Sequence, residues 1–100
     1  MIDFLLDYNI KQATIKKMEK KYNPELLYIL NCNEYEIKKI IMHLKTINIL
    51  RIDDILLDYT ELFLKTYDEF IKIFNKYNTE KLVQAINNDY NILDQIINNN

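Results

Sequence analysis

The chain has 100 residues, of which 49% are hydrophobic and 28% are charged, and its formal net charge is −2. This composition is typical of one globular domain and argues against a disordered chain, and no apolar run approaches the ~20 residues that a membrane span needs. The absence of glycine excludes a glycine-rich phosphate-binding loop, and the single cysteine, Cys32, excludes an internal disulfide.

The amino-acid usage is skewed toward Ile, Asn and Lys, as in AT-rich genomes such as those of low-GC bacteria, their phages and some viruses. The acidic start MIDFLLDYN lacks the basic region of a signal peptide, so we expect no targeting segment and a cytoplasmic protein. Residues 1–51 carry nine basic and six acidic side chains, a net +3, whereas residues 52–100 carry four basic and nine acidic side chains, a net −5. Such a charge distribution can orient a partner but is far from a basic nucleic-acid footprint.

Apolar residues recur with helical spacing along nearly the whole chain, which predicts one all-α domain over residues 1–100. In chain order, helices are expected over Asp3–Tyr8, Gln12–Tyr22, Pro24 to Leu30, Glu34 to Ile47, Ile52–Asp58, Tyr67 to Phe74, Thr79–Ile86 and Tyr90–Ile97. Short helices cannot each bury a full face alone, so we expect an array of about seven to nine short stacked helices.

Local signals place several of these helix starts. Asn23 followed by Pro24 is typical of an N-cap and a first-turn proline. Both Asn33 with Glu36 and Thr66 with Glu69 have the spacing of a capping box. One apolar stripe is expected to face the core, namely Ile37, Ile40, Ile41, Leu44 and Ile47.

Asparagine is expected to replace glycine at left-handed helix ends, because it is the next most tolerant residue there. Six asparagines have suitable positions: Asn9, Asn23, Asn31, Asn48, Asn78 and Asn88. Three segments, LLDYNI, LKTINI and FNKYNT, each carry asparagine in the fifth position, with spacings of 39 and 30 residues. A degenerate helical repeat would produce this pattern, and so would coincidence in a sequence of low complexity.

The segment His43 to Phe74 resembles one unit of the mitochondrial transcription termination factor repeat. The resemblance is carried by Ile52, Ile55, Leu56, Leu62, Phe63, Thr66, Asp68, Phe70 and Phe74. Asn48 stands where that repeat usually has glycine, and Thr60 stands where it has proline. The resemblance covers about a third of the chain and implies a solenoid of stacked helices. Its implied duplex nucleic-acid ligand fits poorly, because the matching unit lies mostly in the acidic half and arginine is nearly absent.

Two charged clusters are candidate binding surfaces. The only basic cluster is made of Lys11, Lys16, Lys17, Lys20 and Lys21; it would bind nucleic acid or an acidic partner, or would simply be a solvated helix face. The C-terminal half offers an acidic, tyrosine-containing surface for a protein partner, made of Asp54, Asp58, Tyr59, Glu61 and Tyr67. Asp53 and Asp54 are more simply first-turn acids that complement a helix dipole, and the remaining tyrosines suit a core rim or an interface.

Catalytic chemistry has little support in the sequence. His43 is expected on the surface, opposite the isoleucine stripe, and Cys32 has no basic neighbour that would activate its thiol. No nucleophile–base set and no cluster of metal ligands presents itself, so we expect no enzyme, no cofactor and no metal. The sequence favours a non-enzymatic module that binds a protein, either a second copy of itself or a host factor blocked by a small phage or viral protein. Nucleic-acid binding through the lysines is the alternative, and no membrane association is expected.

Overall fold

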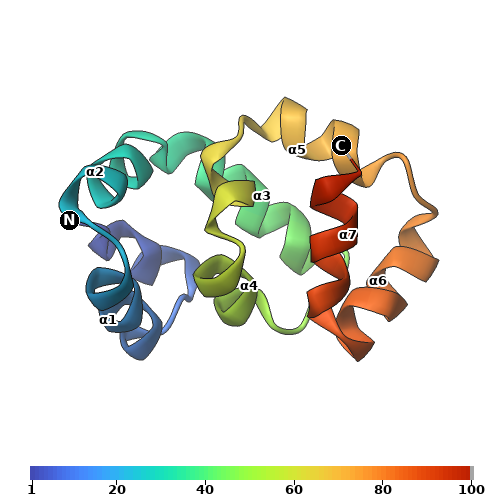
Figure 1. The fold of residues 1–100 in the computed structure, drawn as a ribbon, viewed down its shortest axis with the longest axis horizontal. Coiled ribbons are helices and arrows are strands. Elements are labelled where there is room, and N and C mark those ends of the chain that lie inside the picture. The colour runs from blue at the N-terminus through green and yellow to red at the C-terminus, as the bar shows by residue number, and fades with distance from the viewer. Residues whose placement is uncertain (100) are drawn as a thin grey trace.

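The computed structural model describes residues 1–99, and within them it contains seven α-helices, three 3-10 helices (η) and no strand (Figure 1). The first part of the chain forms η1 (Asp3–Tyr8), α1 (Gln12–Lys21), α2 (Pro24–Cys32) and α3 (Glu34–Thr46). The second part forms α4 (Ile52–Asp58), η2 (Thr60–Leu64), α5 (Tyr67–Phe74), α6 (Thr79–Asn88), η3 (Tyr90–Ile92) and α7 (Leu93–Asn98). The predicted all-α array of short helices is confirmed, although η2 was not expected.

Helix α3 is the central element of an elongated molecule with extents of 35 × 23 × 22 Å. Elements η1, α1 and α2 lie at one end of the long axis, and α6 and α7 lie at the other (Figure 1). Helix α3 packs against η1, α2, α4, η2 and α5, and these contacts bury its apolar stripe. Ile37, Ile40, Ile41 and Leu44 are all at most 1% exposed, and Ile47, at the end of the stripe, is half-buried.

Two of the predicted helix starts have the expected geometry. The Asn23 side chain accepts a hydrogen bond from the Leu26 N–H at 2.9 Å, and Pro24 occupies the first turn of α2. At the start of α5 the Glu69 N–H donates to Thr66 Oγ1 at 3.1 Å, while the Thr66 N–H donates to Glu69 Oε1 at 2.8 Å. This reciprocal pair is the predicted capping box.

The capping box predicted for Asn33 and Glu36 is wrong. The Asn33 side chain makes no cap hydrogen bond to α3 and instead donates to the carbonyl of Phe63 at 2.8 Å. The Glu36 carboxylate accepts the backbone N–H of Tyr67 at 2.8 Å. Both polar side chains therefore satisfy backbone groups around η2 and the start of α5, where the chain is irregular and needs partners.

Only two of the six asparagines predicted at left-handed positions adopt that conformation. Asn9 has φ 67° and Asn48 has φ 69°. Asn23 and Asn78 instead have extended backbones and cap the starts of α2 and α6. The other two predictions, Asn31 and Asn88, are also wrong, because both residues lie inside the last turns of helices.

Asn9 and Asn48 end their helices with the same turn. The Ile10 N–H donates to the Leu5 carbonyl at 3.2 Å, and the Ile49 N–H donates to the Leu44 carbonyl at 2.9 Å. In each case the isoleucine after the asparagine is buried, as in a helix-ending turn closed by an apolar contact. The third aligned segment, FNKYNT, runs from the last residue of α5 to the first residue of α6, and its Asn78 is extended, so it has no such turn. The similarity of LLDYNI and LKTINI thus corresponds to two equivalent turns.

No helix in residues 1–99 is long and apolar enough to cross a membrane.

Candidate functional site

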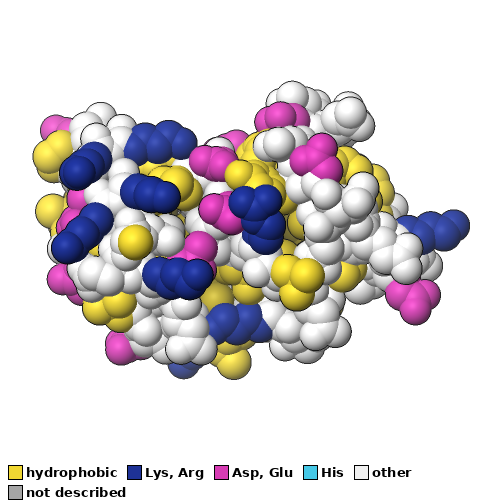
Figure 2. Space-filling model, turned by 90° about the horizontal axis from the view of Figure 1, so that it is seen from below, with side chains coloured by type: hydrophobic (Ala, Val, Ile, Leu, Met, Phe, Trp, Pro, Cys, Tyr) yellow, Lys and Arg dark blue, Asp and Glu magenta, His cyan; other side chains and the backbone are white. Residues whose placement is uncertain are grey.

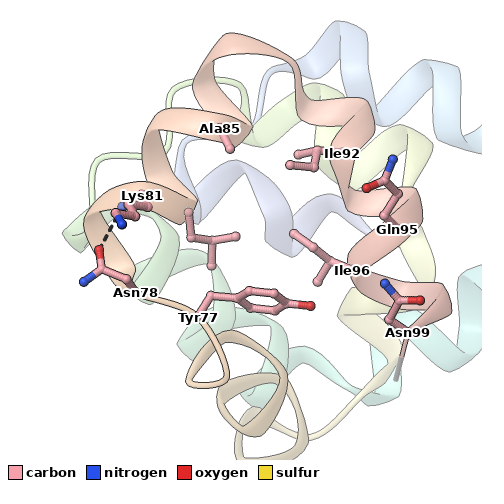
Figure 3. Close-up of a pocket in the computed structure, with 9 residues that line it drawn as sticks. Tyr77, Asn78, Lys81, Ala85, Ile92, Gln95, Ile96 and Asn99 are labelled. Atoms are coloured by element: carbon pink, nitrogen blue, oxygen red, sulfur yellow. Dashed lines mark hydrogen bonds between the residues drawn. The ribbon is translucent and has the colours of Figure 1, made fainter.

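A groove opens between α6 on one side and η3 with α7 on the other (Figure 3). Its volume is about 310 Å³. The walls are apolar and come from Leu82 and Ala85 on α6, from Ile92, and from Ile96 on α7. Figure 3 shows Ile92 and Ile96 pointing across the space toward α6, with Ala85 leaving room for an occupant on the opposite side. The groove can therefore receive an apolar group of modest size.

The rim of this groove is polar. It carries the carboxamides of Asn78, Gln95 and Asn99, the hydroxyl of Tyr77 and one charged side chain, that of Lys81. The ring of Tyr77 lies along the lower side of the groove with its hydroxyl directed toward α7 (Figure 3). Carboxamides both donate and accept hydrogen bonds, which is what a peptide backbone requires from a binding surface. The rim thus suits a polypeptide better than a phosphate or a carbohydrate acid.

Local sequence explains why the groove persists beside the core. Asn78 caps α6 by accepting the Lys81 N–H at 3.0 Å, and Asp89 caps η3 by accepting the Asn91 N–H at 3.0 Å. On α6 and α7 the side chains that face the core are Leu82, Ile86, Leu93 and Ile96. Ala85 and Ile92 lie between these core-facing positions and the solvent, and both are half-buried. Because Ala85 is too small to meet Ile92, the space between the two helices stays open.

Four lysines of the predicted cluster lie on α1, and Figure 2 shows lysine side chains gathered at that end of the molecule. Lys16, Lys17 and Lys20 are exposed. Lys21 has an internal role, because its Nζ donates to the Leu57 carbonyl at 3.1 Å and lies 3.9 Å from Asp58 Oδ1. The structure thus leaves three of the four lysines available to a ligand.

The predicted acidic surface is largely committed to contacts within the chain. Asp54 accepts a hydrogen bond from Arg51 Nε at 2.8 Å, and Asp58 accepts one from the Tyr90 hydroxyl at 2.6 Å. The carboxylate of Asp58 raises the pKa of Tyr90 through that hydrogen bond. Glu61 is exposed. A partner that used Asp54 or Asp58 would have to compete with these contacts.

The two tyrosines of the predicted protein-binding set do not lie open on the surface. Tyr59 is only 5% exposed, so its proposed role as a surface contact is wrong. Its hydroxyl donates to the Asn91 side chain at 3.2 Å, and burial is the main cause that raises its pKa to about 12. Tyr67 is half-buried, and its ring packs edge-on against His43 with centroids 6.1 Å apart. Tyr59 lies between α4 and η2, and the turn of the chain there places its side chain in the core.

His43 is less exposed than expected. Its ring is half-buried and packs edge-on against Phe70 and Phe74, with centroid distances of 5.9 and 6.4 Å. Desolvation in this position lowers the pKa of the imidazole below its ordinary value. His43 lies at the edge of the isoleucine stripe, where α5 packs, whereas Tyr35 and Met42 on the opposite side of α3 are exposed.

An exposed apolar face on α2 was missed by the sequence reasoning. Tyr28 is 60% exposed and Ile29 is 52% exposed, and Cys32 on the same helix is also exposed. Nearby on α3, the exposed ring of Tyr35 lies 4.0 Å from Lys39 Nζ. The composition of α2 held a signal for this face, because Glu25 is its only charged residue and so nearly every position is apolar.

The groove was missed as well. The apolar pair Ile92 and Ile96 is spaced four residues apart, as one helix face requires. That spacing could have indicated an apolar face on the last helix. Nothing in the sequence indicated that this face would be left partly uncovered.

Within residues 1–99 no group of three or more His, Cys, Asp or Glu side chains is arranged to hold a metal ion. Searches against protein-family models, curated proteins and solved structures gave no significant match to this chain.

Proposed function

We propose that this protein is a non-enzymatic protein-binding module, and that it holds an apolar side chain of a partner in the α6–α7 groove. The observation that carries the proposal is the combination of apolar walls with a carboxamide rim. Protein interfaces are commonly anchored by one large side chain in a desolvated pocket surrounded by polar groups. The groove has that arrangement on a small scale.

The size of the groove supports an anchor side chain over a large cofactor. Its volume of about 310 Å³ lies at the lower end of the ~300–1,000 Å³ range of small-molecule sites. A leucine, isoleucine or phenylalanine side chain would contact Ile92 and Ile96 while its backbone stays at the rim. There, Gln95 and Asn99 would exchange hydrogen bonds with the peptide groups of the bound segment.

A selection from random 12-residue peptides displayed on phage tests this function. The immobilised protein should enrich peptides with a shared apolar residue, and those peptides should lose binding to an Ala85→Arg variant, whose long side chain would fill the groove. Gln84→Arg is the matched control, because Gln84 is exposed on the same helix and does not line the groove. Failure to enrich any sequence, or binders that tolerate Ala85→Arg, would contradict the proposal.

Nucleic-acid binding remains the second candidate, and the exposure of Lys16, Lys17 and Lys20 on one helix favours it. The segment that resembles the termination-factor repeat contributes buried residues such as Ile55, Leu56 and Phe63, so what it supports is stacking of helices. If α1 binds phosphates, affinity for a 20-base-pair duplex should fall steeply as salt rises, and neutralising these three lysines should abolish it. An affinity that changes neither with salt concentration nor with neutralisation of these lysines would exclude nucleic-acid binding through α1.

A further inference from the structure

Helix α2 presents an apolar ridge to solvent at one end of the molecule. Tyr28 and Ile29 project outward from it, while Leu27 and Leu30 face the core. A helix that is apolar on both faces normally lies between two partners. In residues 1–99 the inner face of α2 is covered by α3 and η2, and nothing covers its outer face.

The α6–α7 groove is the matching concave feature, and it lies at the opposite end of the long axis (Figure 1). A helix ridge fitted into an apolar groove is a recurring mode of peptide recognition. The local charges match: Glu25 is the only charged residue of α2, and Lys81 is the only charged residue that lines the groove. A ridge with one negative charge would therefore face a groove with one positive charge.

The surroundings of the two features are complementary as well. The end formed by η1, α1 and α2, residues 1–33, carries five lysines and four acids, a net +1. Residues 79–99, which include α6 and α7, carry three acids and one lysine, a net −2. Opposite net charges favour the approach of one end to the other and disfavour contacts between like ends.

We propose that the α2 ridge of one copy of this chain occupies the α6–α7 groove of a second copy, so that chains associate head to tail. This inference rests on the proposed function of the groove and names its occupant. Such an interface is heterologous, because the two copies contribute different surfaces. Since ridge and groove lie at opposite ends of the molecule, each added copy leaves a free ridge and a free groove, and association continues beyond two chains.

Two full-length variants test this arrangement by sedimentation velocity. Ile29→Glu places a charge on the ridge, and Ala85→Arg fills the groove. Wild-type chains should grow in average mass as concentration rises toward about 1 mM, whereas each variant alone should stay monomeric. An equimolar mixture of the two should form complexes of two chains and no larger species, because each variant keeps one intact surface and the complex has no intact surface left.

Matched controls separate this mechanism from general effects of substitution. Met42→Glu makes the same kind of change at a residue on α3 that is 54% exposed, against 52% for Ile29, and should leave the self-association unchanged. Gln84→Arg is the corresponding control for Ala85→Arg, and it should also leave the self-association unchanged. Circular dichroism melting checks that each variant is folded. If Ala85→Arg is unfolded, Tyr77→Ser replaces it, since this change removes one side of the groove from an exposed loop.

The other outcomes overturn the inference in distinct ways. A wild-type chain that stays monomeric throughout the concentration range would show that the ridge does not bind the groove. Loss of association in Ile29→Glu but not in Ala85→Arg would indicate a symmetric contact between two α2 helices. In either case, display-selected peptides that still depend on Ala85 would leave the proposed function standing, and their absence would remove it too.

Discussion

The Thr14 hydroxyl donates a hydrogen bond to Asp53 Oδ2 at 2.7 Å, although the two residues are 39 positions apart in the chain. The same oxygen accepts the backbone N–H of Lys11, which immediately precedes α1, at 2.9 Å. Helix α1 lacks a capping side chain of its own, so a carboxylate in the first turn of α4 takes that role. This contact fixes the helix that carries the exposed lysines to the centre of the molecule.

Removing the Asp53 carboxylate should therefore destabilise the fold. We expect Asp53→Ala to lower the free energy of unfolding by about 1–2 kcal/mol, the usual cost of losing a helix cap or a charged hydrogen bond. Asp54→Ala is the control, because its pairing with Arg51 is solvent-exposed and should contribute less than about 1 kcal/mol. Urea unfolding monitored by circular dichroism measures both, and equal losses would contradict the assigned role of Asp53.

The two kinds of asparagine should respond in opposite ways to glycine. Asn48 has φ 69°, where glycine has no steric penalty, so Asn48→Gly should keep or slightly raise stability and Asn48→Ala should cost about 1 kcal/mol. Asn78 has an ordinary negative φ and caps α6, so Asn78→Ala should cost about 1 kcal/mol and Asn78→Gly only a few tenths. Thermal melts of the four variants check this, and a large loss in Asn48→Gly would count against the left-handed turn.

The half-buried position of His43 predicts a loss of stability in mild acid. Its pKa is lower in the folded chain than the ordinary value of 6.5, because desolvation disfavours the imidazolium. Between those two pKa values the unfolded chain binds more protons, so stability rises with pH in that window. The stability linked to the neutral form of His43 is fully present above about pH 6.5, and it is lost as the pH falls through the pKa that His43 has in the folded chain.

Unfolding free energies measured from pH 7.5 down to 5.5 test this, with His43→Gln as the comparison. The wild-type curve should decline toward acid in this range, and the variant should show a flatter curve. Glu69 does not confound the measurement, because its pKa is lowered from 4.5 by its hydrogen bonds to Thr66 and it acts at more acidic pH. Identical slopes in both proteins would show that His43 is solvated.

The buried hydroxyl of Tyr59 should resist ionisation. Its pKa of about 12 predicts that Tyr59 stays mostly protonated at pH 11, where an exposed phenol has mostly ionised. Ultraviolet titration of the wild type and of Tyr59→Phe measures how much tyrosine ionises at each pH, and so isolates the contribution of Tyr59. Tyr59→Ala should cost about 3–5 kcal/mol of stability, as large-to-small core changes do. If the Tyr59→Ala variant had unchanged stability, Tyr59 would have to lie on the surface and not in the core.

The sequence predicted those parts of the fold that depend on local chemistry. Helix α4 spans the predicted residues Ile52–Asp58, and the capping box of Thr66 and Glu69 forms as expected. Asn33 and Glu36 have the same local pattern, yet they bond to distant backbone groups near η2. Local spacing cannot reveal that competition, because the competing partners are about 30 residues away in the chain.

The candidate site was less accessible to sequence reasoning than the fold. Burial of Tyr59 and cover over His43 depend on where η2 and α5 pack, and neither is encoded in the residues beside them. The groove depends on a gap between two helices at Ala85 and Ile92, which requires knowledge of their relative placement. Exposed lysines, by contrast, were identified from helical spacing alone, because solvated positions impose no tertiary requirement.

The central claim is that the α6–α7 groove is the binding site, and mapping amide chemical shifts on addition of a display-selected peptide tests it most directly. The Ile29→Glu variant should be used, so that self-association does not fill the groove. We predict shifts confined to residues of α6, η3 and α7 and to Tyr77, with no shifts when Ala85→Arg is added to the same chain. Shifts centred on Lys16, Lys17 and Lys20 of α1, or shifts that persist with Ala85→Arg, would contradict the account.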